Sequence, residues 1–289
     1  MTEDGVIDHL LGRSIDAQWK GQLALLLGHG ERKAPRELET IELCFTQTRV
    51  DMRHPVVLNP LRKMGYKFMC AEAAWILRGD NRVMSIEKYS KAISNFSDDG
   101  IWFRGSYGPP VLEQLQYVVN TLVDDPESRQ AVLSIWRPRP GPSRDVPCTV
   151  SMQFMIRRDL LHCLVNMRSS DAWLGWPYDQ FNFSCISAVV AAAYSKCRGH
   201  RPALQLGTLV TTMGSSHLYS RDQLNAEACS IHPVSQRCEP LEIDEWMTDD
   251  YTVLIELLED VANGIRVEHG FLSDVSSIIA SREEKDVKE

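Results

Sequence analysis

The sequence predicts an α+β fold of one domain, in which helices pack against a sheet. Helical and strand-like segments follow one another without the strict β–α–β alternation of a doubly wound parallel fold. Two strand-like segments, 149–157 and 160–167, are separated by only two residues, which predicts a hairpin. No repeat or low-complexity linker divides the chain, so we expect residues 1–289 to form a single domain.

Apolar residues that recur every three or four positions predict five helices. The first is expected at 8–27, because the triplet Gly28-His29-Gly30 that follows it is a helix stop signal. The others are expected, in chain order, at 62–78, 110–124, 181–196 and 251–262. The segment 181–196 is apolar on nearly every side, which predicts a helix that is buried all round. The charged tail at 282–289 is expected to fray.

Five strands are predicted from short segments bounded by turn signals. They are expected at 41–50, 130–136, 149–157, 160–167 and 204–213. A loop rich in proline and glycine, 137–145, separates the second strand from the third and is expected to project from the domain.

Composition limits the classes of partner. Lys and Arg number 31 and Asp and Glu 39, which gives a net charge of −8. This balance argues against a nucleic-acid polymer as partner, but a local arginine cluster can still hold a nucleotide phosphate. No apolar run reaches the roughly 20 residues of a membrane helix, and the first five residues are acidic, unlike a secretory signal. The eight cysteines form no CxxC pair, so we expect a cytoplasmic protein without a metal site or a membrane partner.

Cys148 is the first candidate for chemistry. It stands where the 137–145 loop meets a strand, with Arg144 before it and Arg168 one hairpin later. Cationic neighbours stabilise a thiolate, which is the nucleophilic form of cysteine. A lone cysteine in a strand is more often a core residue, so both interpretations stay open at this point.

Two further stretches carry polar groups after predicted strands. Arg168 and Ser169 combine a guanidinium with a hydroxyl, which suits a phosphate, although Arg168 could instead form a surface salt bridge to Asp171. His217 and Tyr219 alternate along an extended segment, so both side chains should point to one side. The alternative for this pair is a buried, satisfied contact without a ligand.

Together these stretches resemble the thymidylate synthase family. The family motifs stand in the family's order as Pro147-Cys148, residues 168–179 and residues 214–219. Further matches are residues 71–80, which contain Glu72 and end in Gly79-Asp80, then Tyr107-Gly108 and residues 125–129. Glu31-Arg32 is similar to the family's N-terminal phosphate loop, but the expected Thr-Gly is replaced by Lys33-Ala34. The resemblance covers residues 29–219.

The resemblance implies a mixed sheet, a homodimer that forms through the sheet, and two substrates, a pyrimidine nucleoside monophosphate and 5,10-methylenetetrahydrofolate. It implies that Cys148 attacks the base and that Glu72 handles proton transfers. The residues it implies for the nucleotide are Arg32, Arg129 (from the other subunit), Arg168, Ser169, Asp171, His217 and Tyr219. Those it implies for the folate are Trp102, Tyr107, Asp171 and Gly175.

Asp179 is the departure that bears most on function. The chain has Tyr178-Asp179 where thymidylate synthases have Phe-Asn, and the family's asparagine pairs with N3–H and O4 of uracil. Cytosine offers an N4 amino donor and an N3 acceptor, which a carboxyl group can match. The chain therefore looks like the cytidylate and deoxycytidylate 5-hydroxymethylases. Asp179 could also cap the helix predicted at 181–196, and both roles are compatible.

The sequence therefore predicts a one-carbon transferase that hydroxymethylates CMP or dCMP at C5, with Cys148, Glu72 and Asp179 as catalytic residues. Three alternatives stay open. They are a cytidylate methyltransferase in which folate also supplies hydride, a thymidylate synthase, and a non-catalytic nucleotide- or RNA-binding relative. Further departures are Thr149 after the nucleophile, Gln130, Ser215, and a charged C-terminus in place of the family's apolar tail.

Overall fold

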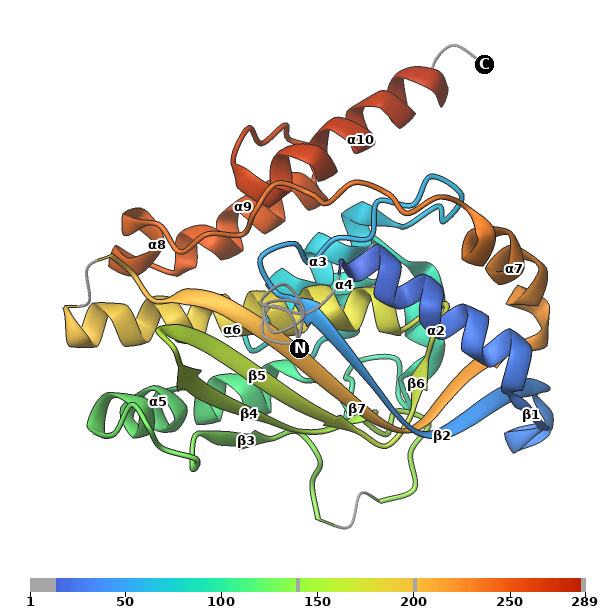
Figure 1. The fold of residues 1–289 in the computed structure, drawn as a ribbon, viewed down its shortest axis with the longest axis horizontal. Coiled ribbons are helices and arrows are strands. Elements are labelled where there is room, and N and C mark those ends of the chain that lie inside the picture. The colour runs from blue at the N-terminus through green and yellow to red at the C-terminus, as the bar shows by residue number, and fades with distance from the viewer. Residues whose placement is uncertain (1–13, 139–140, 200–201, 287–289) are drawn as a thin grey trace, which may run out of the picture.

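Helices cover one face of a mixed sheet in the computed structural model, which describes residues 14–138, 141–199 and 202–286 (Figure 1). The strands are β1 (Glu31–Lys33), β2 (Thr40–Asp51), β3 (Val132–Ser134), β4 (Thr149–Arg157), β5 (Leu160–Met167), β6 (Ser170–Asp171) and β7 (Gln205–Tyr219). The α-helices are α2 (Ile15–His29), α3 (Tyr66–Leu77), α4 (Val83–Ile86), α5 (Gly108–Asp124), α6 (Trp176–Arg198), α7 (Gln223–Ile231), α8 (Glu245–Asp249), α9 (Thr252–Ala262) and α10 (Gly270–Asp286). Three short 3₁₀ helices are η1 (Pro35–Glu37), η2 (Lys91–Phe96) and η3 (Ser220–Asp222).

The strand order is β1-β2-β7-β5-β4-β3, and β6 pairs with β7. β5 and β6 run parallel to β7, while the other neighbouring strands are antiparallel, so the predicted mixed sheet is confirmed. A parallel pair needs a long crossover between its strands, and α6 is the helix of the crossover from β5 to β7. This topology places the C-terminal end of β5, the start of α6 and the end of β7 close to one another.

The predicted hairpin between β4 and β5 is also confirmed. Its two turn residues, Arg158 and Asp159, have φ values of 53° and 58°, and Arg157 pairs with Leu160. Two consecutive residues with positive φ make a turn whose twist matches that of the flanking strands. The turn fixes the register of both strands, because the side chains of a strand alternate between its two faces.

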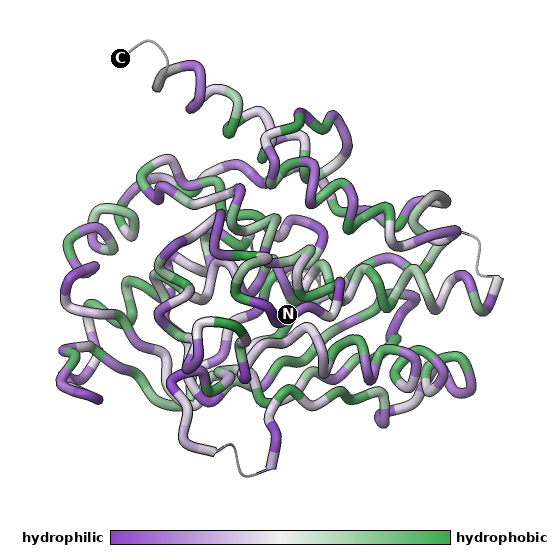
Figure 2. The backbone as a smooth tube through the Cα atoms, turned by 180° about the vertical axis from the view of Figure 1, so that it is seen from behind, coloured by the Kyte–Doolittle hydropathy of each residue, from purple (hydrophilic) through white to green (hydrophobic). Residues whose placement is uncertain are grey.

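The core lies between the sheet and α6. Alternate residues of β4 and β5 are fully buried, such as Phe154 and Val165, while their neighbours on the other face are partly exposed. α6 is buried almost throughout, as predicted, and its Ser184, Ser187 and Ser195 hydroxyls donate to carbonyls four residues earlier. α3 packs against α6, and α9 packs against α3 (Figure 1). The tube of α10 alternates between hydrophilic and hydrophobic residues, as expected for a helix with one covered face (Figure 2).

Several element boundaries differ from the predictions. The first helix continues through His29 and is capped at Gly30, and the predicted part at 8–13 lies outside the described residues. α6 begins at Trp176, five residues early, and β7 extends six residues further, to Tyr219. The tail predicted to fray from residue 282 instead continues α10 as far as residue 286. Within it, the Arg282 side chain donates to the carbonyl of Met64 at 2.8 Å.

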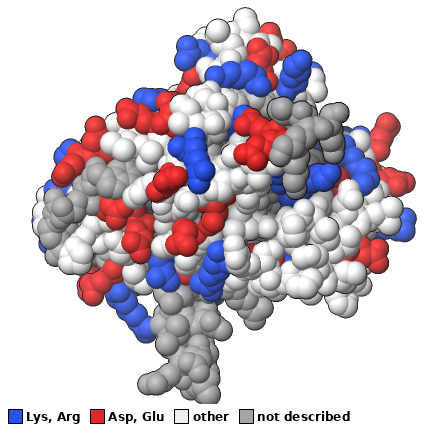
Figure 3. Space-filling view, turned by 90° about the horizontal axis from the view of Figure 1, so that it is seen from above, with Lys and Arg blue, Asp and Glu red and all other residues white. Residues whose placement is uncertain are grey.

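None of the helices in the described ranges is long and apolar enough to cross a membrane. All eight cysteines are free thiols. On the face drawn in Figure 3, basic and acidic side chains are interspersed rather than gathered in one basic surface.

Candidate active site

The pairing of β4 with β5 brings Cys148 and Arg168 side by side. Cys148 directly precedes β4, Arg168 directly follows β5, and the Arg168 amide donates to the Cys148 carbonyl at 2.9 Å. The Arg168 guanidinium donates to the carbonyls of Pro147 and Val146, both at 2.9 Å, and one of its nitrogens lies 3.6 Å from the Cys148 Sγ atom. Arg168 is therefore tied to the loop that carries the thiol rather than to Asp171.

Burial outweighs the cationic neighbours of Cys148. The pKa of the thiol is raised, chiefly because the side chain is buried, and the negative charge of Asp179 adds to this shift. Arg168 and Arg36 act in the opposite direction by favouring the thiolate. The unliganded protein therefore holds Cys148 mainly as a thiol at neutral pH, with the guanidinium in place to receive negative charge on sulfur.

The sequence predicted that Arg144 lies beside the Cys148 thiol, but the Arg144 side chain contacts other residues. Its amide donates to an Asp98 carboxylate oxygen at 2.9 Å, and its guanidinium donates to the carbonyl of Ser97. These contacts hold the 137–145 loop against the segment that precedes α5. The expectation for Arg144 was wrong because spacing in sequence says nothing about which side of a loop a long side chain takes.

Glu72 on α3 and Asn182 on α6 face each other across the two helices. The Asn182 side-chain amide donates to Glu72 Oε2 at 2.8 Å. Burial raises the pKa of Glu72 to about 7, and the hydrogen bond from Asn182 limits that rise because it stabilises the charged form. A carboxyl group that is half-protonated near neutral pH can both accept and donate a proton during a reaction.

Asp179 lies in the first turn of α6, three residues before Asn182 and on the same side of the helix. The N-cap position belongs to Gly175, whose carbonyl accepts the Asp179 amide at 3.0 Å, so the predicted capping role is wrong. The pKa of Asp179 is raised well above its usual range by burial, and then by the neighbouring charges of Glu72 and Asp171. Both effects favour the protonated form of Asp179.

The pairing of β6 with β7 sets Asp171 opposite His217. One Asp171 oxygen accepts two backbone amides of the following turn, at 2.8 and 3.0 Å, which fixes the carboxyl group. His217 Nδ1 lies 3.5 Å from the Ser169 hydroxyl, and its ring meets that of Tyr219 edge-on at 5.4 Å. Burial lowers the pKa of His217 although Asp171 opposes this, so the imidazole is neutral at neutral pH.

Tyr107 stands at the N-cap position of α5 and reaches the residue after the thiol. Its hydroxyl lies 3.0 Å from the Thr149 hydroxyl and 3.3 Å from the Thr149 amide nitrogen. Its pKa is raised well above the usual range by burial, then by the negative charges of Asp179 and Cys148. Tyr107 therefore lies close to Cys148 and Asp179. We call the group around Cys148, which includes Glu72, Arg168 and Asp179, the centre.

The N-terminal arginines occupy different places. Arg32 is exposed on β1, where it pairs in register with Ile41 of β2. Arg36 lies in the turn between the two strands, with φ of 57°, and its charge acts on both Cys148 and His217. Arg36, which the sequence did not single out, is thus the arginine of this segment that acts electrostatically on the centre.

Arg129 lies away from the thiol of its own chain. It is exposed just before β3, and its carbonyl accepts the Gln153 side-chain amide at 2.8 Å. Gln153 is five positions beyond Cys148 along β4, a span of roughly 16 Å in an extended strand.

The two remaining candidates differ in their surroundings. A methyl group added to Gly175 would lie 3.4 Å from Asp179 Oδ2 and 3.5 Å from the Asp171 carbonyl, so glycine keeps the approach to the Asp179 carboxyl open. Trp102 is 45% exposed, bridges to Arg82, and lines a separate cavity beside α3. The structure therefore brings Glu72, Tyr107, Arg168 and Asp179 close to Cys148, but it leaves Arg32 exposed on β1, Arg129 beside Gln153, and Trp102 in that other cavity.

The centre combines a thiol, two buried carboxyl groups and an arginine that contacts the thiol. This set can add sulfur to an electrophilic carbon and move protons on either side of the acceptor. Among the described residues, no cluster of three or more His, Cys, Asp or Glu side chains is placed to hold a metal.

Comparison with known proteins gives the family. A sequence model of the family described as thymidylate synthase matches residues 17–251. The chain belongs to the thymidylate synthase family. The thymidylate synthase of varicella-zoster virus strain Dumas is 25% identical over 237 residues, which cover 71% of this chain and 76% of the viral protein. The thymidylate synthase of the Oka vaccine strain matches with the same values.

Membership in the thymidylate synthase family makes the protein a one-carbon transferase. The family uses a nucleotide and methylenetetrahydrofolate, and the α+β model with its mixed sheet agrees with the family fold. Residues 252–286, which contain α9 and α10, follow the matched segment.

Sequence reasoning missed Asn182 and Arg36. Asn182 is three residues from Asp179, and helical spacing would have placed both on one face had the helix been expected to begin at Trp176. Arg36 lay outside the recognised motif, and only the tight turn at residues 34–38 turns it toward the centre.

We expect Asn182→Leu to move the pH profile of the reaction to higher pH. The substitution removes the hydrogen-bond donor that stabilises ionised Glu72, so the pKa of Glu72 should rise further. Loss of a hydrogen bond to a charged group is worth about 1.5 kcal/mol or more, equivalent to roughly one pH unit. The measurement is the pH dependence of C5 proton exchange on the nucleotide.

Asn182→Ser, which keeps a donor, should restore most of the original profile. Asn166→Leu is the matched control, because it removes a side-chain amide on β5 that bonds to Ser151. It should leave the pH profile unchanged. An unaltered profile in Asn182→Leu would show that Asn182 does not set the ionisation of Glu72.

Proposed function

We propose that the protein transfers a hydroxymethyl group to C5 of a cytidine monophosphate, CMP or dCMP, with methylenetetrahydrofolate as co-substrate. The observation that carries the proposal is the carboxyl group of Asp179, whose pKa is raised by burial and by the charges of Glu72 and Asp171, so that its protonated form is favoured. Asp179 stands where thymidylate synthases have an asparagine, at the position that pairs with the base.

Asp179 suits cytosine because it can give up a proton. In the proposed reaction Cys148 adds to C6, and negative charge spreads through the ring toward N3. A neutral carboxyl group can donate its proton to N3 while its other oxygen accepts from the N4 amino group. An amide can form hydrogen bonds there but cannot supply the proton, so an acid at this position favours reaction of cytosine.

Glu72 and Asn182 support the hydroxymethyl product over the methyl product. Methylenetetrahydrofolate supplies the carbon that bonds to C5. Loss of the C5 proton and departure of tetrahydrofolate then leave an exocyclic methylene on the base. Water adds to this carbon, and the thiolate of Cys148 leaves C6. The Asn182 Oδ1 atom is buried and has no hydrogen-bond partner among the described residues, so it can accept from that water beside Glu72, which acts as base.

Other residues hold the substrates in this proposal. Arg168 and Ser169 bind the phosphate, aided by Arg36 or Arg32 from the N-terminal turn, and Arg168 stabilises the thiolate once the ligand excludes water. His217 and Tyr219 meet the sugar hydroxyl groups. The residues proposed to position the folate are Tyr107, Asp171, Gly175 and Trp102. Trp102 is the least supported of these, because it lines another cavity.

The first prediction concerns the product. Wild-type protein with CMP or dCMP and methylenetetrahydrofolate should give the 5-hydroxymethyl nucleotide, identified by mass spectrometry. It should also release tritium from C5. Cys148→Ser should lose both reactions and still bind the nucleotide, because the hydroxyl group is a far weaker nucleophile. Cys163→Ser, which replaces a buried thiol on β5, is the control for the effect of changing a cysteine to serine. A 5-methyl product would replace the proposal with the methyltransferase alternative.

The second prediction concerns base choice. Asp179→Asn should reduce kcat/KM with the cytidylate and allow reaction of the uridylate. An unmatched contact of this kind costs on the order of 1–3 kcal/mol, about ten- to a hundredfold. Rates with both nucleotides give the measurement, and Asp159→Asn in the exposed hairpin is the matched control. An unchanged preference for cytidylate would mean that the base is selected elsewhere.

The third prediction concerns the proposed homodimer. Arg129 bonds to Gln153, which is five positions beyond Cys148 along β4, and the adjacent sheet face is only partly covered. We propose that Arg129 completes the phosphate site of a second copy. Arg129→Ala and Cys148→Ser should each be inactive alone, whereas a mixture should regain activity through heterodimers with one intact site. Light scattering that gives the mass of one chain would contradict this arrangement.

A further inference from the structure

A cavity of about 730 Å³ lies beside α3, on a face other than the one that carries Glu72. Ala71, Ala74, Trp75 and Arg78 line it and are spaced as one face of a helix, while Glu72 is turned toward α6. The other lining residues come from the segment after α3, from Trp102 and from α9. They are Gly79, Asp80, Arg82, Ser85, Lys88, Tyr89, Trp102, Glu259, Ala262 and Asn263.

This cavity does not belong to the matched family segment alone. The family match ends at residue 251, whereas α9 begins at Thr252 and supplies Glu259 and Ala262 to the wall, followed by Asn263 just after the helix. α9 packs directly on α3, as Figure 1 shows. The helix that bears the proposed catalytic Glu72 therefore forms one wall of a second, chemically distinct cavity.

Positive charge exceeds negative charge in the cavity. Arg78 forms a two-pronged ion pair with Glu259, with both distances 2.9 Å, and Arg82 pairs with Asp80 at 2.8 Å. Lys88, the third cation, has only neutral partners among the described residues. Its Nζ lies 3.5 Å from Asn263 Oδ1 and 4.6 Å from the centre of the Tyr89 ring.

Donors are in excess as well. Trp75 Nε1 is buried and has no acceptor within the described parts of the chain. Arg78 and Arg82 each engage their carboxylate through Nε and Nη2, which leaves Nη1 for another acceptor. A buried donor without a partner is costly, so this cavity suits a ligand rich in acceptors.

The aromatic side chains narrow the class of ligand. Trp75, Tyr89 and Trp102 all line the cavity, and Trp102 leaves 45% of its surface exposed. Flat rings stack on such surfaces, and a cation beside them favours an anion that is attached to the ring. Both substrates of the proposed reaction have this chemistry, the nucleotide through its phosphate and the folate through its aminobenzoyl-glutamate end.

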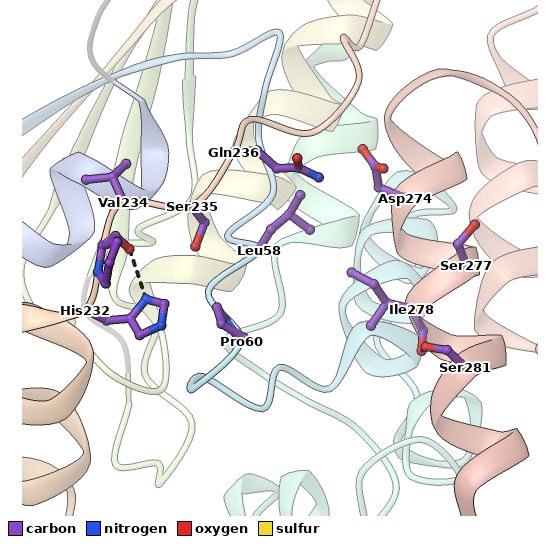
Figure 4. Close-up of a pocket in the computed structure, with 11 residues that line it drawn as sticks. Leu58, Pro60, His232, Val234, Ser235, Gln236, Asp274, Ser277, Ile278 and Ser281 are labelled. Atoms are coloured by element: carbon purple, nitrogen blue, oxygen red, sulfur yellow. Dashed lines mark hydrogen bonds between the residues drawn. The ribbon is translucent and has the colours of Figure 1, made fainter.

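We propose that this cavity is a second ligand site, which binds an anion linked to a flat aromatic ring. The choice of substrate-derived probes rests on the proposed function, but the binding measurement does not require turnover. The other large hollow, between residues 232–236 and α10, is a weaker candidate (Figure 4). It has no Lys or Arg in its lining, and its Asp274 already accepts the Glu239 amide at 2.8 Å.

The test is calorimetric titration of the full chain with p-aminobenzoyl-glutamate and, separately, with CMP. Arg168→Ala is the background, so that the nucleotide site proposed above is weakened. At least one probe should bind, and Lys88→Met should weaken that binding tenfold or more. Lys91→Met, which removes an exposed lysine of η2 outside the cavity, should leave it unchanged. Binding of the glutamate probe alone would assign the site to folate, and binding of CMP alone would assign it to nucleotide.

Failure of both probes to bind would overturn the second site without bearing on C5 hydroxymethylation. Binding of a probe that Lys88→Met leaves unchanged would also overturn the second site. Conversely, a chain that forms no hydroxymethyl product but still binds a probe through Lys88 would retain the second site and lose the proposed function.

Discussion

The rest of the centre depends on the hydrogen-bonded register between β4 and β5. Because Thr149 pairs with Met167, the residue before one strand meets the residue after the other, and Cys148 and Arg168 become neighbours. A shift of one position would turn every side chain of a strand to the opposite face. The two-residue turn at Arg158-Asp159 fixes the register as far as Ser151, and an irregularity between Ser151 and Thr149 then shifts it by one position. The turn and this shift together set the position of the thiol.

A second constraint is the low polarity around α6. Three carboxyl groups, those of Glu72, Asp171 and Asp179, lie in a region that hydrates charge poorly, and burial is the main cause that raises the pKa of each. Asp179 is raised further by the charges of Glu72 and Asp171. The arrangement therefore provides proton donors and acceptors without any metal ligand set among the described residues.

Much of the fold could be predicted from the sequence because local patterns decide it. The hairpin and the buried helix follow from spacing and from apolar content, and both are confirmed. β7 was predicted too short because its last six residues are mostly polar or small, and their strand geometry depends on pairing with β2. α10 was not predicted, although its buried residues Leu272, Val275 and Ile279 recur at helical spacing.

The residues of the candidate site were predicted less completely than the fold. Residues in contiguous motifs, such as Cys148 and Arg168, meet as expected, since strand pairing brings the motifs together. Arg144 and the capping role of Asp179 were wrong because side-chain direction and the true start of α6 depend on packing. Asn182 and Arg36 were missed for the same reason, since each becomes meaningful only once another element lies opposite it.

The pairing of β2 with β7 also has a consequence for synthesis on the ribosome. β2 ends at Asp51, but its partner begins at Gln205, so about 150 residues must be translated before the strand finds its neighbour. At typical elongation rates this takes on the order of 10 to 30 seconds, during which β2 has an unpaired edge. Phe45 lies at the middle of that strand and is exposed even after folding, so beside the unpaired edge it adds an aromatic surface for other chains. The nascent chain, rather than the finished enzyme, is therefore the form of this protein most in need of a chaperone.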